Sequence, residues 1–341
     1  MIEFVATVLA VGLWGGLAPS PAISPGYRVT DTLKLGGDGG WDYLTFDPAS
    51  RRLFVSHGTH VVVVDVDTKS AVGDIPDTPG VHGIAIASDL GRGFISNGRS
   101  ATVTIFDLKT LGKIGEVKTG ENPDAILYDR ASGRVFTFNG RSGDATAFDA
   151  AHGTVAGTIP LGGKPEFAVA DGKGRVYVNI EDKSEIVALD AKALQVKSRW
   201  PLEPCEEPSG LAFDSEHGRL FTVCRNRLMA IVDATTGRIV TTLPIGSGVD
   251  GAAYDPATGL VFAANGEGTL TVAHEDSPDS FRVVENVPTQ AGARTLALDP
   301  KTHRVFLSTA QLGPRPAPTA EVPRPRPSIV PGSFVVLVVG K

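Results

Sequence analysis

The sequence predicts an all-β protein, a seven-bladed β-propeller with four antiparallel strands in each blade. Near-copies of one unit recur about every 40 residues, and seven copies can be aligned. The chain of 341 residues also holds 40 glycines and 24 prolines between short apolar runs that show almost no helical period. Self-similarity at this spacing is typical of propellers and solenoids. We therefore expect one turn-rich domain whose core is shared among the blades.

The clearest copy of the unit spans residues 208–249, and it contains four short runs that alternate apolar and small residues. The runs are separated by turn sequences such as Ser-Glu-His-Gly and Ala-Thr-Thr-Gly. Alternation bounded by turn residues is the pattern of β-strands. The expected strands of this blade are residues 210–214, 219–223, 228–233 and 239–243.

The second strand of every copy carries an aromatic residue at the same position. We expect each ring to pack between neighbouring blades, where burying a Phe side chain contributes about 1.5–3 kcal/mol. Seven such positions predict seven blades. They are Phe54, Phe94, Phe136, Tyr177, Phe221, Phe262 and Phe306.

The last copy lacks a fourth strand, because the chain stops at Lys341 just after its third. The alternating run at residues 27–35 precedes the first copy and has the pattern of a fourth strand. We predict that this run pairs beside residues 334–339 and closes the ring, which removes exposed sheet edges. The propeller would then be a single domain over residues 27–341, and we expect a monomer.

A proline-rich insertion at residues 311–331 separates the second and third strands of the last copy. Proline at this density predicts extended chain outside any sheet. Arg315, Arg324 and Arg326 make the insertion locally positive. It could be a rigid surface flap, a cover over the central channel or a docking segment for a partner.

Residues 1–22 have the character of a signal peptide. Residues 2–18 are apolar but short and interrupted by glycine, and small residues suited to signal peptidase follow. The positive residues usual before such a segment are missing, so the true start could lie upstream, or the segment could stay as an N-terminal anchor. We expect a periplasmic or secreted protein whose only membrane contact would be that anchor.

The charge balance argues against nucleic acid as a partner. The chain has 32 basic and 38 acidic residues, for a net charge of −6. Nonspecific attachment to nucleic acid or to anionic lipid needs a clustered positive surface. The expected partner is instead a small ligand or another protein.

The two cysteines are placed for a disulfide. Cys205 lies in the turn that leads into the fifth blade, and Cys224 ends the second strand of that blade. Both positions belong to one face of one blade, and an exported chain favours oxidation of such a pair. The alternatives are two unlinked small hydrophobic side chains, or a metal site, which two thiols alone would serve poorly.

Polar residues gather where the channel opens, at the start of each first strand and the end of each second strand. We predict ligand binding at this face through Asp42, His57, His82, Asp124, Glu166, Ser209, Asp250 and Arg294. Like charges there should raise one another's pKa. The alternative is a solvated channel mouth that Arg294 partly neutralises.

The same face could hold a metal ion. Carboxylate and carbonyl oxygens suit Ca²⁺ or Mg²⁺, whereas His57 with His82 would suit Zn²⁺ or Cu²⁺. The expected cofactor is either none or a divalent cation, Ca²⁺ or Mg²⁺ before Zn²⁺ or Cu²⁺. Asn97, Asn139 and Asn265, at the ends of second strands, could instead be turn residues that bond their own backbone.

Other polar positions have weaker functional prospects. Five histidines lie in turns on the opposite face or edge, or beside third strands: His60, His152, His217, His274 and His303. The aspartates after the first strands should open turns by bonding backbone two residues on: Asp47, Asp129, Asp171, Asp214, Asp255 and Asp299. The sequence contains no nucleophile elbow, phosphate loop, dinucleotide fingerprint or haem attachment site, so most familiar enzyme classes are excluded.

Two features of the repeat point to a known family. Three second strands end in asparagine after an aromatic residue, at residues 94–97, 136–139 and 262–265. A D-x-x-T-G turn follows a third strand at residues 233–237. The chain resembles the YVTN family of bacterial seven-bladed propellers, related to YncE-like proteins, over residues 28–341. The resemblance implies the fold and an exported binding or scaffold protein, and it implies no activity. Ile180 and Thr309 stand where the pattern has asparagine.

Three functions are compatible with these features. The favoured one is a non-catalytic exported propeller that binds a ligand or partner protein at the channel face. The second is a divalent-metal-dependent hydrolase, lactonase-like at fold level only, with the cation held by Glu166, Asn139, Asn265 and Asp250. The third is the propeller subunit of a periplasmic dehydrogenase. No residue is assigned a catalytic role.

Overall fold

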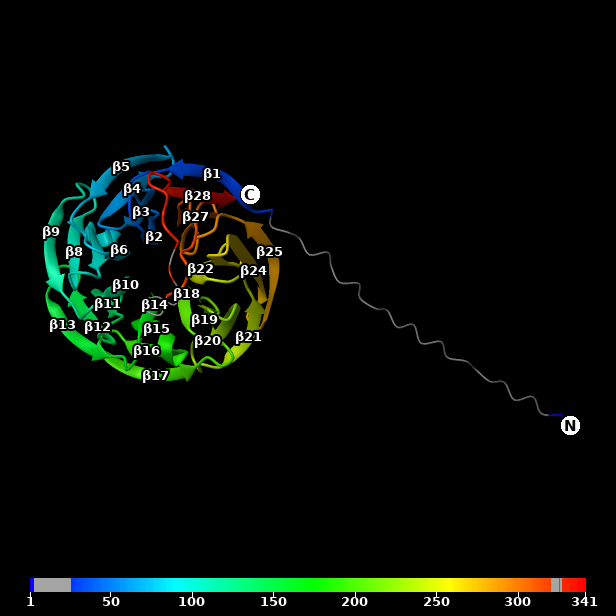
Figure 1. Ribbon diagram of the computed structural model, residues 1–341. Helices are drawn as coiled ribbons and strands as arrows, with labels where there is room; N and C mark the ends of the chain where they lie inside the picture. The colour runs from blue at the N-terminus through cyan, green and yellow to red at the C-terminus, as the bar shows by residue number, and fades with distance from the viewer. Residues whose placement is uncertain (3–25, 320–324, 326) are drawn as a thin grey trace.

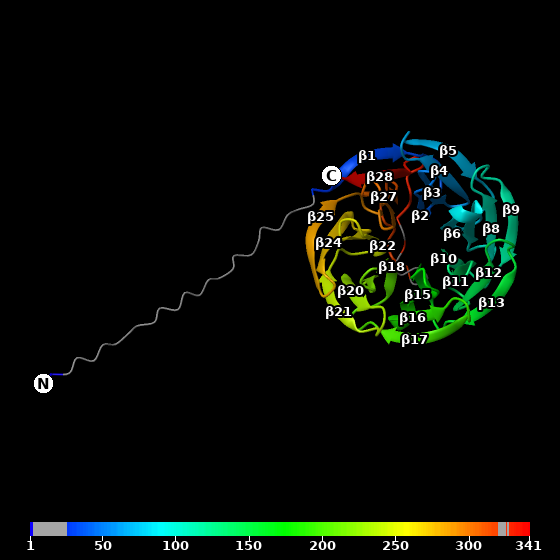
Figure 2. The same ribbon diagram turned by 180° about the vertical axis from the view of Figure 1, so that it is seen from behind.

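The computed structural model describes residues 1–2, 26–319, 325 and 327–341, and its strands form a closed ring of sheets (Figure 1, and from behind in Figure 2). The expected signal peptide lies outside the described residues apart from Met1 and Ile2. Within the described part of the chain, no helix is long and apolar enough to cross a membrane.

The described residues form seven antiparallel sheets of four strands each, as predicted. Blade one is β2 (Trp41–Asp47), β3 (Arg52–His57), β4 (His60–Asp65) and β5 (Ser70–Ile75). Blade two is β6 (Val81–Ala87), β7 (Arg92–Asn97), β8 (Thr102–Asp107) and β9 (Lys113–Lys118). Blade three is β10 (Pro123–Asp129), β11 (Arg134–Asn139), β12 (Asp144–Asp149) and β13 (Val155–Pro160). Blade four is β14 (Pro165–Ala170), β15 (Arg175–Ile180), β16 (Glu185–Asp190) and β17 (Gln195–Pro201).

Blade five is β18 (Pro208–Asp214), β19 (Arg219–Cys224), β20 (Leu228–Asp233) and β21 (Ile239–Pro244). Blade six is β22 (Val249–Asp255), β23 (Leu260–Asn265), β24 (Thr269–Ser277) and β25 (Ser280–Pro288). Blade seven combines β26 (Leu296–Asp299), β27 (Arg304–Thr309) and β28 (Val335–Gly340) with β1 (Arg28–Lys34). Two 3₁₀ turns, η1 (Ser88–Leu90) and η2 (Glu181–Lys183), connect first to second and second to third strands.

The ring closes as predicted, through pairing of the first strand with the last. β1 runs antiparallel to β28, with Val29 opposite Val339 and Leu33 opposite Val336. In Figure 1 the blue β1 lies beside the red β28 at the rim of the ring. The pairing covers the edge that β28 would otherwise present.

The predicted aromatic residues form the core between blades. All seven are at most 3% exposed. Phe54 lies 5.7 Å from the ring of Phe106 in blade two, and Phe94 lies 5.7 Å from the ring of Phe148 in blade three. Because each aromatic side chain packs on the neighbouring blade, these seven positions hold adjacent blades of the propeller together.

The first-strand aspartates make the predicted turns. Asp214, for example, accepts hydrogen bonds from the backbone N–H of Glu216 at 2.9 Å and of His217 at 3.0 Å. The equivalent carboxylates of Asp47, Asp171 and Asp299 also accept a backbone N–H two residues on. These bonds reverse the chain between first and second strands.

The predicted disulfide is present. Cys205 and Cys224 are bonded, with a Cα–Cα distance of 5.6 Å, and both side chains are fully buried. The described residues of the proline-rich insertion lie outside the four-stranded sheets, as expected. An isolated bridge between Leu312 and Ile329 closes its base, where the N–H of Val330 donates to the carbonyl of Gln311 at 2.9 Å.

Candidate functional site

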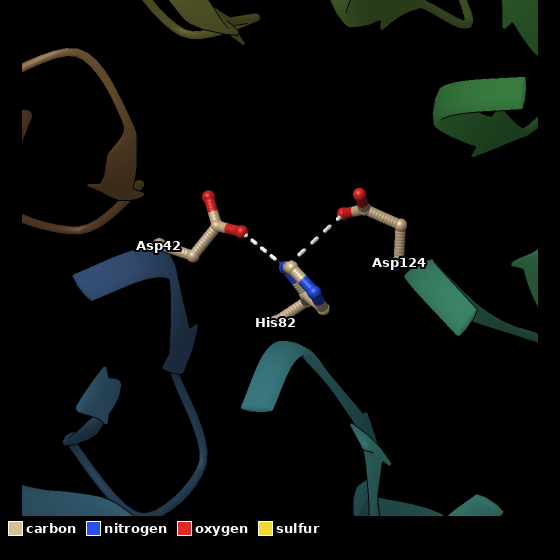
Figure 3. A group of neighbouring side chains, drawn as sticks. All are labelled: Asp42, His82 and Asp124. Carbon is tan, nitrogen blue, oxygen red and sulfur yellow. Dashed lines mark hydrogen bonds and ion pairs between the residues drawn. The ribbon is translucent and has the colours of Figure 1, made fainter. Parts of the chain in front are cut away.

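The innermost strands carry the predicted ring of polar residues at their starts. Asp42, His82 and Asp124 are the second residues of β2, β6 and β10, and in Figure 3 their side chains point toward one another from three adjacent blades. Hydrogen bonds from neighbouring blades fix the backbone at these positions. Thr295 Oγ1 donates to the carbonyl of Asp42, and Ser96 Oγ donates to that of Asp124, each at 2.5 Å. The side chains are therefore held on a rigid rim.

Six of the eight predicted ring residues line one cavity of about 540 Å³ at the channel mouth. They are Asp42, His82, Asp124, Glu166, Asp250 and Arg294. The other polar or aromatic side chains in the lining are Trp41, Tyr43, Arg99, Asn122, Lys164 and Glu181. The sequence thus located the cavity and half of its polar lining.

His82 lies between two carboxylates. Its Nδ1 atom is 2.6 Å from Oδ2 of Asp42 and 3.7 Å from Oδ1 of Asp124 (Figure 3). Burial alone would lower the pKa of His82. The hydrogen bond that His82 donates to Asp42 and the charges of Asp124, Asp42 and Glu166 outweigh the effect of burial and raise the pKa to about 9. His82 is therefore a cation at neutral pH.

The facing carboxyl groups have raised pKa values, as predicted. Burial and then the charge of Asp42 raise the pKa of Asp124 to about 7, although His82 opposes the shift. Burial and then the charge of Asp124 raise the pKa of Glu166 to about 8, against the attraction of Lys164. These carboxyl groups titrate as a coupled set.

Ion pairs made by two basic residues, Lys164 and Arg294, border the cluster. Lys164 Nζ lies 2.7 Å from Oε1 of Glu166 and also contacts the carboxylate of Glu181. Arg294 Nε lies 2.9 Å from Oδ2 of Asp250. Burial raises the pKa of Asp250 to about 6 even though Arg294 opposes the shift. The fixed cations therefore compensate the acidic groups only in part.

Acidic side chains outnumber permanently charged basic side chains in the lining. Among the described residues that line the cavity, five carry carboxyl groups (Asp42, Asp124, Glu166, Glu181 and Asp250), and three are permanent cations (Arg99, Lys164 and Arg294). His82 supplies a fourth positive charge while it is protonated. One Asp42 oxygen, one His82 nitrogen and one Asp124 oxygen lie within 4.8 Å of one another, a spacing that could hold a metal ion.

His57 and Ser209 lie outside this lining. The His57 ring stacks on Phe334 with centroids 4.2 Å apart, and its Nδ1 is 3.4 Å from Nε2 of His60. Burial lowers the pKa of His57 to about 4. Ser209 Oγ donates to the carbonyl of Val249 at 3.2 Å, which joins blade five to blade six. Both residues have structural contacts, and His57 does not share the cavity with His82.

The asparagines at the ends of second strands brace the third strands. Asn139 Nδ2 donates to Asp144 at 2.6 Å and to Thr146 at 3.0 Å. Asn265 Nδ2 donates to Thr269 at 3.0 Å and to Thr271 at 2.9 Å. The alternative of bonding to their own backbone is replaced by these side-chain bonds, which Asn97 repeats in blade two.

The four residues predicted to share a cation are therefore placed apart. Glu166 and Asp250 line the mouth cavity, whereas Asn139 and Asn265 are fully buried inside their own blades and are not part of the lining. The side chains that instead join the carboxylates are His82 and Lys164.

The sequence-based prediction used one position at each strand end, and it therefore omitted several residues that line the cavity. Lys164 directly precedes β14, and Glu181 directly follows β15 in η2. Arg99 and Asn122 lie in the loops that follow β7 and precede β10. All four flank ring positions by one or two residues, so a wider window at each strand end would have found them.

The proline-rich insertion reaches the same face. A second cavity, of about 430 Å³, is lined by Leu312, Arg315, Pro327 and Ile329 of the insertion, and also by Trp41 and Arg294. Trp41 and Arg294 belong to the lining of the mouth cavity as well. The described part of the insertion therefore borders the mouth.

Comparisons with known proteins support the fold and leave the activity open. No protein family model and no curated protein matches the chain. Among solved structures, the chain resembles a chain of Kuenenia stuttgartiensis hydrazine synthase at 16% identity and a TM-score of 0.69, over 79% of this chain and 92% of that one.

Two further structures are similar over nearly their whole length. A chain of a mitotic checkpoint complex has 16% identity and a TM-score of 0.73, over 95% of this chain and 99% of that one. U3-55K has 10% identity and a TM-score of 0.76, over 92% and 99%. These similarities show that the chain is a seven-bladed β-propeller.

Proposed function

We propose that the protein is an exported, non-catalytic propeller that binds a cationic ligand in the mouth cavity. The ligand would be a divalent metal ion or the ammonium group of a small organic molecule. The observation that carries the proposal is the Asp42–His82–Asp124 cluster, in which acidic groups from adjacent blades crowd together with too few fixed cations. A bound cation would let Asp124 and Glu166 ionise together.

Two features support export. The disulfide between Cys205 and Cys224 is typical of proteins from oxidising compartments. The resemblance of the repeat to the YVTN family favours the same location. A rigid rim around a polar mouth is also the arrangement expected of a binding protein, since little ordering is needed when the ligand arrives.

Calorimetric titration of the full chain, freed of metal with EDTA, would test the proposal at pH 8. The probes are CaCl₂, MgCl₂, MnCl₂ and ZnCl₂ in one arm, and ethylamine and putrescine in the other, so that the arms separate metal from ammonium. We expect saturable binding in one arm, and at least tenfold weaker binding by Asp124→Asn. Glu121→Gln, an exposed acid outside the cavity lining, is the matched control.

Binding should also weaken as the pH falls. Protonation of Asp124 and Glu166, whose pKa values are about 7 and 8, would compete with the cation. Affinity that is unchanged between pH 8 and pH 5.5, or equal in Asp124→Asn and in the wild type, would place the ligand elsewhere.

A second candidate is a metal-dependent hydrolase that acts at the same mouth. One observation favours it: a carboxyl group with a pKa near 7, such as Asp124, is suited to general acid–base work. A cation held beside it would polarise the carbonyl of a lactone or ester. Turnover of small lactones that requires added metal and is lost in Asp124→Asn would favour this candidate over pure binding.

A further inference from the structure

A second polar cluster lies at the end of the blades opposite the mouth. It consists of Asp214, which ends β18, His217 in the turn before β19, and Glu275 near the end of β24. β18 begins at the mouth with Pro208 and Ser209, so its last residue lies at the other end of the strand. The cluster joins blade five to blade six and is separate from the ligand cavity proposed above.

The three side chains converge on one point. His217 Nδ1 lies 2.8 Å from Oδ2 of Asp214 and 3.1 Å from Oε1 of Glu275. The carboxylates are buried, with side chains 2% and 3% exposed, whereas the His217 side chain is 35% exposed. The cluster is therefore exposed to solvent only on its His217 side.

Glu275 is only weakly satisfied. An imidazole Nδ1 carries at most one proton, and that of His217 serves Asp214. Among the described residues, no hydrogen bond of standard geometry reaches either carboxylate oxygen of Glu275. Burial raises the pKa of Glu275, and the nearby hydroxyl of Tyr254 opposes that shift. Arg219 opposes it as well, but is bonded to Asp233, to Asp279 and to the carbonyl of Pro278.

The neighbouring blades show how the corresponding aspartates are normally paired. Asp255 of blade six is 2.7 Å from Nδ1 of His303, and Asp299 of blade seven is 2.7 Å from Nη1 of Arg51. In each case one basic side chain faces one buried carboxylate. Blade five is different, because a second buried carboxylate, Glu275, shares the single histidine.

We propose that Asp214, His217 and Glu275 bind a divalent transition-metal ion, of which Zn²⁺ is the best representative. One imidazole nitrogen and two carboxylate oxygens, with water in the fourth position, form a set that Zn²⁺ accepts, whereas Ca²⁺ prefers oxygen alone. Tetrahedral Zn²⁺ ligands lie about 3.3 Å apart, so the two carboxylate oxygens need to move away from His217 Nδ1 by only about 0.5 Å or less. The ion would link blade five to blade six and supply a positive charge beside Glu275.

Titration of ZnCl₂ into the metal-free full chain tests the inference in a background of Asp42→Asn with Asp124→Asn, which disables the mouth cluster. We expect about one bound ion and a melting temperature raised by roughly 3–5 °C at 100 times the Kd. Adding His217→Gln or Glu275→Gln to that background should weaken Zn²⁺ binding at least tenfold. Because the mouth cluster is disabled in this background, the Zn²⁺ result does not depend on whether the mouth binds a ligand.

His152→Gln is the matched control. His152 and Asp149 form the same turn pair three residues apart, at 2.8 Å, without a third buried acid. Glu275→Gln guards against misfolding, because it removes a buried charge that is only weakly satisfied and should keep or raise the metal-free melting temperature. Absence of Zn²⁺ binding in the mouth-disabled background, or equal binding with and without His217→Gln and Glu275→Gln, would overturn the inference.

Discussion

His82 Nδ1 lies 2.6 Å from Oδ2 of Asp42, across the interface between blades one and two. The two residues are 40 positions apart, one repeat of the chain, and each is the second residue of an innermost strand. Their contact exists because the ring brings equivalent positions together. The same geometry brings Asp124 within 3.7 Å of the same nitrogen, so the repeat builds the polar mouth directly.

The first prediction concerns the charge of His82. Its pKa of about 9 depends on Asp42 and Asp124, so Asp124→Asn should lower that pKa, and Asp42→Asn should lower it further because it also removes the hydrogen bond. An NMR titration of the imidazole resonances would measure both values. His152, an exposed histidine paired with Asp149, serves as an internal control that neither substitution should move. A His82 pKa that stays unchanged in both variants would contradict the electrostatic account.

The second prediction concerns stability and pH. Asp124, Glu166 and Asp250 have folded-state pKa values of about 7, 8 and 6, above the unfolded values near 4. Each raised pKa gives stability that is present below pH 4 and lost as the pH rises through the folded value. His82 acts in the same direction between about pH 6.5 and 9. The metal-free protein should therefore lose stability from about pH 5 to pH 9.

Denaturant unfolding at several pH values would measure this slope. Glu166→Gln should flatten it between pH 5 and 8, since the substituted side chain has no proton to lose. Glu121→Gln should leave the slope as in the wild type. His57, with a pKa lowered to about 4, contributes the opposite sign, and only between about pH 4 and 6.5. A wild-type slope that Glu166→Gln does not change would remove the mouth carboxyls as its cause.

The architecture could be predicted from the sequence, whereas the mouth could be predicted only in part. Phe54 and its equivalents mark each blade because the interface between blades requires a large apolar ring at one register. Asp42, His82 and Asp124 followed from the same register. Lys164 and Glu181 lie in connecting loops, where the repeat imposes no pattern, and their contact with Glu166 depends on loop geometry.

Histidine roles were harder to predict for the same reason. His57 occupies a ring position, yet Phe334, next to the insertion, covers it. The sequence predicts that His217 lies in a turn, and the structure confirms it, but Glu275 also contacts His217 from the next blade. β24 spans nine residues, against six in β20, and Glu275 lies in the extra length. This contact between His217 and Glu275 is visible only in the three-dimensional structure.

The third prediction concerns the disulfide. The bond between Cys205 and Cys224 closes a loop over a sequence separation of 19 residues and lies in the apolar core of blade five. Closing a loop of this length stabilises a fold by about 3 kcal/mol. Replacing both cysteines with alanine should lower the melting temperature by roughly 5 °C. Free-thiol labelling of the native wild-type protein should find no reactive cysteine, and two labelled thiols would contradict the bond.

The fourth prediction concerns ring closure, on which the position of every mouth residue depends. Leu33 on β1 is 6% exposed and packs with Val336 and Val338 of β28, whereas its neighbour Thr32 faces solvent. Leu33→Ala should cost about 2–4 kcal/mol of unfolding free energy, and Thr32→Ala should cost less than about 0.5 kcal/mol.

Loss of closure would also have a second, independent consequence. If β1 detaches, the edge of β28 becomes a free row of backbone donors and acceptors that can pair with another chain. Leu33→Asp, which places a charge in that core, should therefore shift the protein toward dimers or larger species in light scattering after size exclusion. Thr32→Asp, on the solvent side of the same strand, should remain as the wild type. Detachment of β1 should also disturb the mouth, where Asp42 of blade one and Arg294 of blade seven lie 3.9 Å apart in the closed ring. Leu33→Asp should therefore weaken ligand binding. Unaltered binding by an opened ring would mean that the ligand site does not depend on the contact between blades seven and one.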